Sequence, residues 1–195
     1  MTLDAINSLQ EKSLDAHIGI IIPPGIENFD TIKNRILQSI IQRENIHFVE
    51  GQKHFDNWNP TQHKLDMQLF AGQFNPVIWL DSDIFVLKDL LQSAKIFAQS
   101  GKWMALLRDH VNNDPAFLSR WEDGAERCFV PQACYMIFRS DIIKEFFNLW
   151  ESIWREWIYP SPFFSHPDPA PHFPGSAFCI EQYALAQALR RFIGV

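Results

Sequence analysis

The sequence predicts an α/β fold whose largely parallel sheet is flanked by helices. Short apolar, β-branched runs alternate with stretches in which apolar residues recur at helical spacing, and the connections between them are tight. The chain has 195 residues, 47% of them hydrophobic, which suffices for one packed domain of ordinary size.

Six elements are expected before residue 81. The helices show apolar residues three or four positions apart, and the strands are short, mostly apolar runs rich in Ile and Val. Proline, glycine or a polar loop separates most of them, and Asp30 is the expected N-cap of the second helix. In chain order the elements are a helix at 2–14, a strand at 17–22, a helix at 30–42, a strand at 46–49, a helix at 61–70 and a strand at 77–80.

The second half contains longer aromatic elements. An apolar run predicts a buried strand at 129–138, and helices are expected at 141–158 and 177–192. The first of these helices carries aromatic residues at helical intervals, which we expect in the core: Phe147, Trp150, Trp154 and Trp157. Between the helices, the proline-rich stretch 160–174 predicts a loop, which is either an acceptor-binding lid or a linker.

Composition excludes several classes of function. The net charge of −6 and the pI of about 5.6 provide no basic surface for nucleic acid. No apolar run approaches the roughly 18 residues of a membrane span. Three cysteines without a CxxC pattern give poor support for a disulfide framework or a structural zinc site. Because the N-terminus also does not resemble a signal peptide, the expected compartment is a reducing cytoplasm.

Two aspartates interrupt the otherwise apolar segment PVIWLDSDIFVL. Asp81 and Asp83 are two positions apart, so in an extended backbone their side chains lie on one face. Neighbouring carboxylates at the end of a buried strand repel each other, and a hard cation such as Mg²⁺ or Mn²⁺ relieves that repulsion while leaving positions open for phosphate. The carboxyl end of a parallel strand is also where α/β sheets bind ligands. The segment therefore predicts a metal–diphosphate site; the alternative is a strand-end turn in which the aspartates are caps.

With these residues in view, the segment KLDMQLFAGQFNPVIWLDSDIFVLKDL (64–90) resembles the centre of GT-A fold glycosyltransferases, especially family 8 and its relatives. In that family a basic residue opens the preceding helix, and Lys64 lies 17 positions before Asp81, in a similar arrangement. Weaker similarity appears at 129–139, where the family has an Asn-x-Gly strand, and at Glu181-Gln182, where it has an Asp-Gln pair.

The resemblance implies one GT-A-like domain over residues 1–195, with a nucleotide-sugar and metal half (1–90) and an acceptor half (91–195). It implies transfer of a sugar from a nucleotide-diphosphate-sugar donor, with a UDP-sugar favoured, to an unknown acceptor, possibly a carbohydrate. Asp81 and Asp83 would hold Mn²⁺ or Mg²⁺. The donor would be bound by these two residues with Lys64, Ser82 and Gln132, and the catalytic residues would be Glu181 and Gln182.

This chain departs from the family pattern in three places. The family's first strand precedes the helix that begins here at Thr2, so the fold is expected to lack it, and an exposed sheet edge would invite a homodimer. Gln132-Ala133-Cys134 replaces Asn-x-Gly, and no histidine follows His172 to supply the family's usual third metal ligand.

Two other functions stay open. The chain could be a degenerate relative that binds a nucleotide-sugar or a partner without turnover. It could also be a phosphatase of the haloacid-dehalogenase type, in which Asp81 is a covalent nucleophile and Asp83 a general acid. Phe85 and the late position of the motif in the chain argue against the phosphatase.

Overall fold

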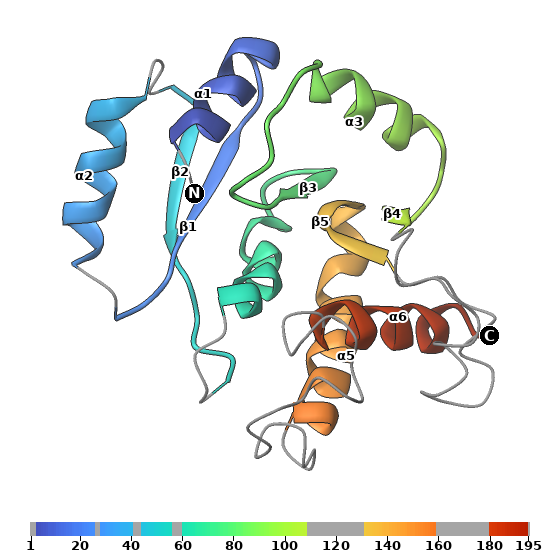
Figure 1. The fold of residues 1–195 in the computed structure, drawn as a ribbon. Helices are drawn as coiled ribbons and strands as arrows, with labels where there is room; N and C mark the ends of the chain where they lie inside the picture. The colour runs from blue at the N-terminus through green and yellow to red at the C-terminus, as the bar shows by residue number, and fades with distance from the viewer. Residues whose placement is uncertain are drawn as a thin grey trace. The chain divides into compact units, whose positions relative to one another are not determined.

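The computed structural model describes residues 3–25, 28–40, 44–55, 60–108, 131–158 and 180–194 (Figure 1). The fold is mixed α/β, and the chain divides into two compact units. The first unit comprises Met1–Ala105 with Cys134–Asp141, and the second comprises Leu106–Ala133 with Ile142–Val195. The stretch expected to form a proline-rich loop, 160–174, lies outside the described residues.

A small parallel sheet opens the first unit. The elements, in order, are α1 (Leu3–Lys12), β1 (Ile18–Ile22), α2 (Phe29–Ser39) and β2 (Ile46–Glu50). β1 pairs with β2 in parallel, with Ile18 opposite Ile46 and Ile22 opposite Glu50. An apolar cluster of buried isoleucines from α1, β1 and the end of α2 holds these elements together: Ile6, Ile18, Ile20, Ile22 and Ile40.

The start of α2 differs from the expectation. The N-cap is Asn28, not Asp30, because the Asn28 side chain accepts hydrogen bonds from the backbone N–H groups of Asp30 (3.0 Å) and Thr31 (3.3 Å). Asp30 lies in the first turn instead, where its negative charge faces the positive end of the helix dipole. Both residue types are good caps, so sequence alone did not distinguish them.

A second sheet follows in the chain. η1 (Pro60–Phe70), a 3₁₀ helix, leads to β3 (Val77–Leu80); α3 (Leu90–Gln99) and β4 (Met104–Arg108) come next, and then β5 (Pro131–Phe138). The strand order is β3-β5-β4, and β3 and β5 are antiparallel, with Val77 opposite Phe138 and Leu80 opposite Tyr135. The expectation of one largely parallel sheet is therefore met only by β1 and β2. An apolar run predicts a strand but not its direction, which is why the antiparallel pair was missed.

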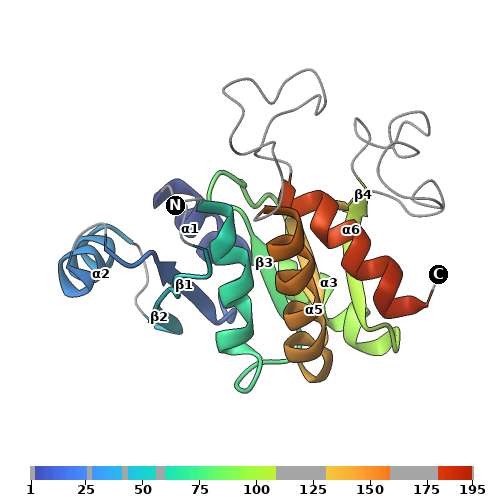
Figure 2. The same cartoon turned by 90° about the horizontal axis from the view of Figure 1, so that it is seen from below.

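Helices cover β3 on two sides. In Figures 1 and 2, α1 and α3 lie on one side of β3 and η1 lies on the other. Two hydrogen bonds join α1 and the residue that follows it to the segment before α3: Val86 N–H donates to Ser8 Oγ at 3.0 Å, and Ser13 Oγ donates to Asp89 Oδ1 at 3.0 Å. β1 packs on η1 through Gly19, where a Cβ atom would come within 2.6 Å of the Phe70 ring.

The second unit is built around α5 (Ser140–Ile158) and α6 (Ile180–Ile193). Phe147, Trp150 and Trp154 are fully buried, which confirms that the aromatic stripe is core; the side chain of Trp157 lies outside the described part. Trp150 Nε1 donates a hydrogen bond to the backbone carbonyl of Glu181 at 3.0 Å, and this contact ties α5 to the beginning of α6.

No helix in the described part of the chain has the length and apolar character needed to cross a membrane.

Candidate functional site

A cavity of about 730 Å³ lies within the first unit. Its walls come from α1, β1, η1, β3 with its flanking residues, and the first turns of α3. Three of the residues expected to bind a donor, Asp81, Ser82 and Asp83, line it where β3 ends, and Lys64 lines it from η1. The structure therefore brings four of the residues predicted to bind a donor to the wall of one cavity.

Asp81 is held by both strand and helix. Its backbone N–H donates to the carbonyl of Cys134 on β5 at 2.9 Å, which extends the β3–β5 ladder by one residue. Its carboxylate accepts from Lys64 Nζ at 3.1 Å through Oδ2 and from Trp79 Nε1 at 2.6 Å through Oδ1. The Lys64 side chain is only 6% exposed, so this ion pair gives a buried ammonium the partner that it requires.

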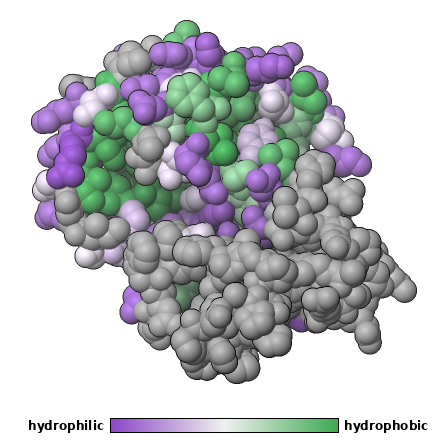
Figure 3. Space-filling model, in the orientation of Figure 1, coloured by the Kyte–Doolittle hydropathy of each residue, from purple (hydrophilic) through white to green (hydrophobic). Residues whose placement is uncertain are grey.

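Asp83 occupies a different environment. It is exposed, as is Ser82, in the turn that begins when Ile84 N–H donates to the Asp81 carbonyl at 3.1 Å. The next apolar residues, Phe85 and Leu87, are 62% and 75% exposed. Figure 3 shows apolar areas among hydrophilic residues on the face that it displays. Of the two carboxylates in the motif, one is therefore fixed by neighbours and the other faces solvent.

The number of carboxylates at this site bears on how a cation could be bound. Within the described ranges, no group of three His, Cys, Asp or Glu side chains is arranged to hold a metal ion. Mg²⁺ often takes one or two carboxylates from a protein and completes its shell with phosphate oxygens and water. That Asp81 and Asp83 hold a cation together with a diphosphate stays a prediction.

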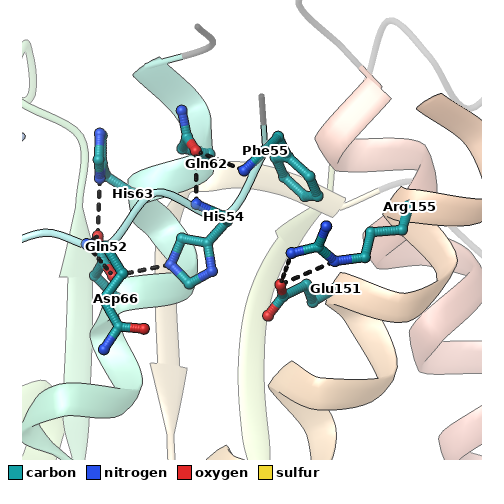
Figure 4. A network of polar contacts seen from close by, with 8 residues as sticks. All are labelled: Gln52, His54, Phe55, Gln62, His63, Asp66, Glu151 and Arg155. Carbon is teal, nitrogen blue, oxygen red and sulfur yellow. Dashed lines mark hydrogen bonds and ion pairs between the residues drawn. The ribbon is translucent and has the colours of Figure 1, made fainter. Parts of the chain in front are cut away.

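A buried polar network that was not predicted from the sequence adjoins the cavity. Asp66 is fully buried and accepts from His54 Nε2 at 2.9 Å and from His63 Nδ1 at 2.8 Å, as Figure 4 shows. The backbone N–H of Gln52 also donates to this carboxylate, at 3.1 Å. His63 lines the cavity beside Lys64. Only the three-residue spacing of His63 and Asp66 was visible in the sequence; His54 joins them through tertiary contact.

The network fixes the charge state of Asp66. Burial alone would raise the pKa of this carboxyl, but hydrogen bonds from His54, His63 and the Gln52 N–H outweigh burial and lower the pKa. Gly51 permits the close packing, because a Cβ atom there would lie 2.8 Å from both Asp66 Oδ2 and His63 Nδ1. Asp66 is therefore an anion that orients two histidines, one of which borders the cavity.

Cys134 lies on β5, close to the charges of the Lys64–Asp81 ion pair. Burial, followed by the negative charge of Asp81, raises the pKa of its thiol. A thiol with a raised pKa is a poor nucleophile at neutral pH, so the structure gives Cys134 a packing role.

The remaining predicted site residues belong to the second unit. Gln132 is exposed on β5, and Glu181 is 4% exposed in the first turn of α6. Gln182 is half-buried, and its buried Oε1 atom accepts no hydrogen bond from the residues that the structure describes. Their proposed contacts with a donor sugar stay predictions.

Comparison with known proteins gives no independent assignment. No protein-family model matches the chain, and neither the curated proteins nor the solved structures contain a match. The candidate site therefore rests on its residues and geometry, and the resemblance to GT-A fold glycosyltransferases is carried by sequence motifs alone.

Proposed function

We propose that this protein is a metal-dependent glycosyltransferase of GT-A type that moves a sugar from a nucleotide-diphosphate-sugar, with a UDP-sugar favoured, to an acceptor. The observation that supports the proposal best is the Lys64–Asp81 ion pair at the end of β3, next to the exposed Asp83 and at the wall of a cavity. The motif resemblance implies that these residues form one donor site, and their common position at the cavity wall supports the proposal. A cytoplasmic setting belongs to the same proposal.

The charges at this site suit a diphosphate only when a cation accompanies it. Asp81 and Asp83 are both acidic, and Lys64 already shares its charge with Asp81. A bare diphosphate would therefore meet net negative charge, which disfavours binding. A bound Mg²⁺ or Mn²⁺ would neutralise the leaving diphosphate as a Lewis acid.

Each protein residue has a separate task in this proposal. Lys64 and Trp79 hold the Asp81 carboxylate in one orientation through two hydrogen bonds. Asp83, in the exposed turn, offers a carboxylate that can adjust its position. Ser82 lies between them in the sequence and at the cavity wall, and in this proposal its hydroxyl would donate to a phosphate oxygen.

The first test is calorimetric titration of UDP, GDP and their sugars, with and without Mn²⁺, on the native protein and on Asp83→Asn. We expect binding only with Mn²⁺, and a loss of at least about tenfold in Asp83→Asn, because one of two carboxylate ligands is gone. Glu11→Gln is the matched control: it removes one exposed carboxylate from α1 and should leave binding unchanged.

The outcomes separate the functions considered. Metal-dependent binding followed by sugar transfer in an acceptor screen would support the proposal. Binding without any transfer or hydrolysis would favour a degenerate binding domain. Absence of binding to every nucleotide, with and without Mn²⁺, would contradict both.

A further inference from the structure

His63 combines a place at the cavity wall with a ring nitrogen that has no partner in the described part of the chain. It lies on η1 directly before Lys64, and both residues line the cavity. The ammonium of Lys64 already pairs with Asp81, whereas the His63 ring is bonded only through Nδ1, to Asp66. Figure 4 shows the second ring nitrogen, Nε2, on the side that faces away from Asp66. Nε2 is therefore the atom of this ring that can meet a bound molecule.

The charge of Asp66 decides which nitrogen of His63 carries the proton. An ionised carboxylate only accepts hydrogen bonds, and the lowered pKa of Asp66 keeps it ionised. The Nδ1 atom, 2.8 Å from Asp66 Oδ2, is therefore the donor. In the neutral ring the other nitrogen is then an acceptor with a lone pair. The contact with Asp66 thus gives His63 the tautomer that can take up a proton at Nε2.

The local fold holds the His63 ring in this orientation. In a 3₁₀ helix, side chains three residues apart lie one above the other, which places His63 next to Asp66. Gly51 packs against the same ring, because a Cβ atom at Gly51 would lie 3.1 Å from His63 Cε1. The side chain of His63 is only 9% exposed. Turning the ring towards solvent would break these contacts and remove one of the donors to Asp66.

His54 is a comparison within the same network. Its Nε2 atom is bonded to the other oxygen of the carboxylate, Asp66 Oδ1, at 2.9 Å. The side chain of His54 is buried as well, but it does not line the cavity. Two histidines enclosed in the packing would satisfy Asp66 equally well, so stability does not require one of them at the cavity wall. The position of His63 is therefore the feature of the network that calls for a chemical role.

His63 is also the best-placed base among the titratable groups that line the cavity. Lys64 and Asp81 are paired with each other, and His17 is bonded through Nδ1 to His47 at 2.9 Å. The two others are exposed carboxylates that no hydrogen bond from the described residues orients: Asp15 and Asp83.

We propose that His63 is a catalytic residue of this cavity, whose Nε2 atom takes the proton from the acceptor hydroxyl that attacks the donor sugar. This role rests on the proposed sugar transfer and adds the group that activates the acceptor. As the proton moves to Nε2, the hydroxyl oxygen bonds to the anomeric carbon, and the bond from that carbon to the diphosphate oxygen breaks. The electron pair of the broken bond leaves with the diphosphate, and His63 then gives the proton to solvent. Asp66 is a positioning residue, because it acts only through His63.

The test measures the release of UDP from UDP-glucose and UDP-galactose with Mn²⁺, with water as the acceptor. We expect His63→Ala to release UDP at least about a hundredfold more slowly than the native protein, because a positioned general base contributes that much or more. Calorimetric titration of the same donors should give a Kd within about threefold of the native value, because His63 is not a proposed donor ligand. His47→Ala is the matched control: it removes a half-buried histidine that does not line the cavity, and it should release UDP at the native rate.

Added small bases distinguish proton transfer from a purely structural role of the ring. In His63→Ala, imidazole should raise the rate of UDP release at least about tenfold, because it supplies the missing base. Pyrazole has the same size but is a far weaker base, so it should not. Equal restoration by the two compounds would mean that the ring only fills space and would overturn the proposal.

The same measurements separate this role from the proposed function. Equal rates of UDP release in the native protein and in His63→Ala would overturn the role of His63 and leave the donor site standing. Binding of a donor without any release of UDP by the native protein would do the same. If neither UDP-sugar binds in the presence of Mn²⁺, the proposed function itself is contradicted, and the role of His63 with it.

Discussion

Replacing Asp66 should destabilise the folded protein, because of the environment of its side chain. Its carboxylate is fully buried and bonded to two histidines and a backbone N–H. In Asp66→Asn one oxygen becomes an amide N–H₂ group, so at least one histidine loses its acceptor. We expect the free energy of unfolding at pH 7 to fall by about 2 kcal/mol, measured by urea denaturation. The exposed control Glu11→Gln should change it by less than about 0.5 kcal/mol.

Asp66 also predicts a pH dependence. The lowered pKa means that Asp66 stabilises the folded state fully above its unfolded pKa, about 3.9, and that this contribution disappears as the pH falls through the lower folded value. The difference in unfolding free energy between the native protein and Asp66→Asn should therefore shrink between pH 5 and pH 3. A difference that is constant over this interval would show that the Asp66 carboxyl is not held ionised by its neighbours.

For individual residues, spacing along the chain explains which contacts could be predicted from the sequence. The distance along the chain between Lys64 and Asp81, with the motif resemblance, assigned both to one site, and the structure shows them in contact. The contact of His54 with Asp66 was not predicted, because it depends on how the loop after β2 folds against η1. No periodicity in the sequence encodes that approach.

At the scale of elements, the beginning of α2 provides a direct test. Asn28→Ala removes the side-chain acceptor for two backbone N–H groups and should lower the free energy of unfolding by about 1 kcal/mol. Asp30→Ala removes only a charge in the first turn and should lower it by about 0.5 kcal/mol or less. Thermal unfolding of the two variants side by side measures which loses more stability. A larger loss in Asp30→Ala would show that Asp30, and not Asn28, is the N-cap.

The elements themselves were largely predictable, because apolar periodicity and turn residues mark them. β1, β3 and the buried face of α5 fall where the pattern placed them. α3 and β4 were not predicted, although Asp89 does cap α3 by accepting from Leu91 N–H. Strand direction and sheet membership also could not be predicted, because they depend on which apolar edges meet in space.

At the scale of the whole molecule, β4 and β5 each contribute residues to both compact units. Since these strands continue from one unit into the other, we expect the units to unfold together. Trp150→Phe removes the hydrogen bond to the Glu181 carbonyl and part of a fully buried side chain, which should cost about 2 kcal/mol. The substitution should therefore also lower the stability of the first unit.

Hydrogen exchange at increasing urea measures this coupling. Amides of β1 report on the first unit and amides of α6 on the second, and Trp150→Phe should lower both midpoints equally. Trp103→Phe, at a side chain that is 48% exposed, is the control and should move neither by much. Loss of protection in α6 alone would mean that the units unfold separately.

The different anchoring of Asp81 and Asp83 affects how changes in the motif should be interpreted. The Asp81 side chain pairs with the buried Lys64 ammonium, so replacing it would disturb folding as well as the proposed cation site. Asp83 is exposed in a turn, so replacing its carboxylate should change the stability of the fold little. Under the proposed function, a variant that keeps Asp81 and loses Asp83 should therefore stay folded and lose cation binding. Under the proposed function, a library at position 83 could change metal preference without first repairing the fold.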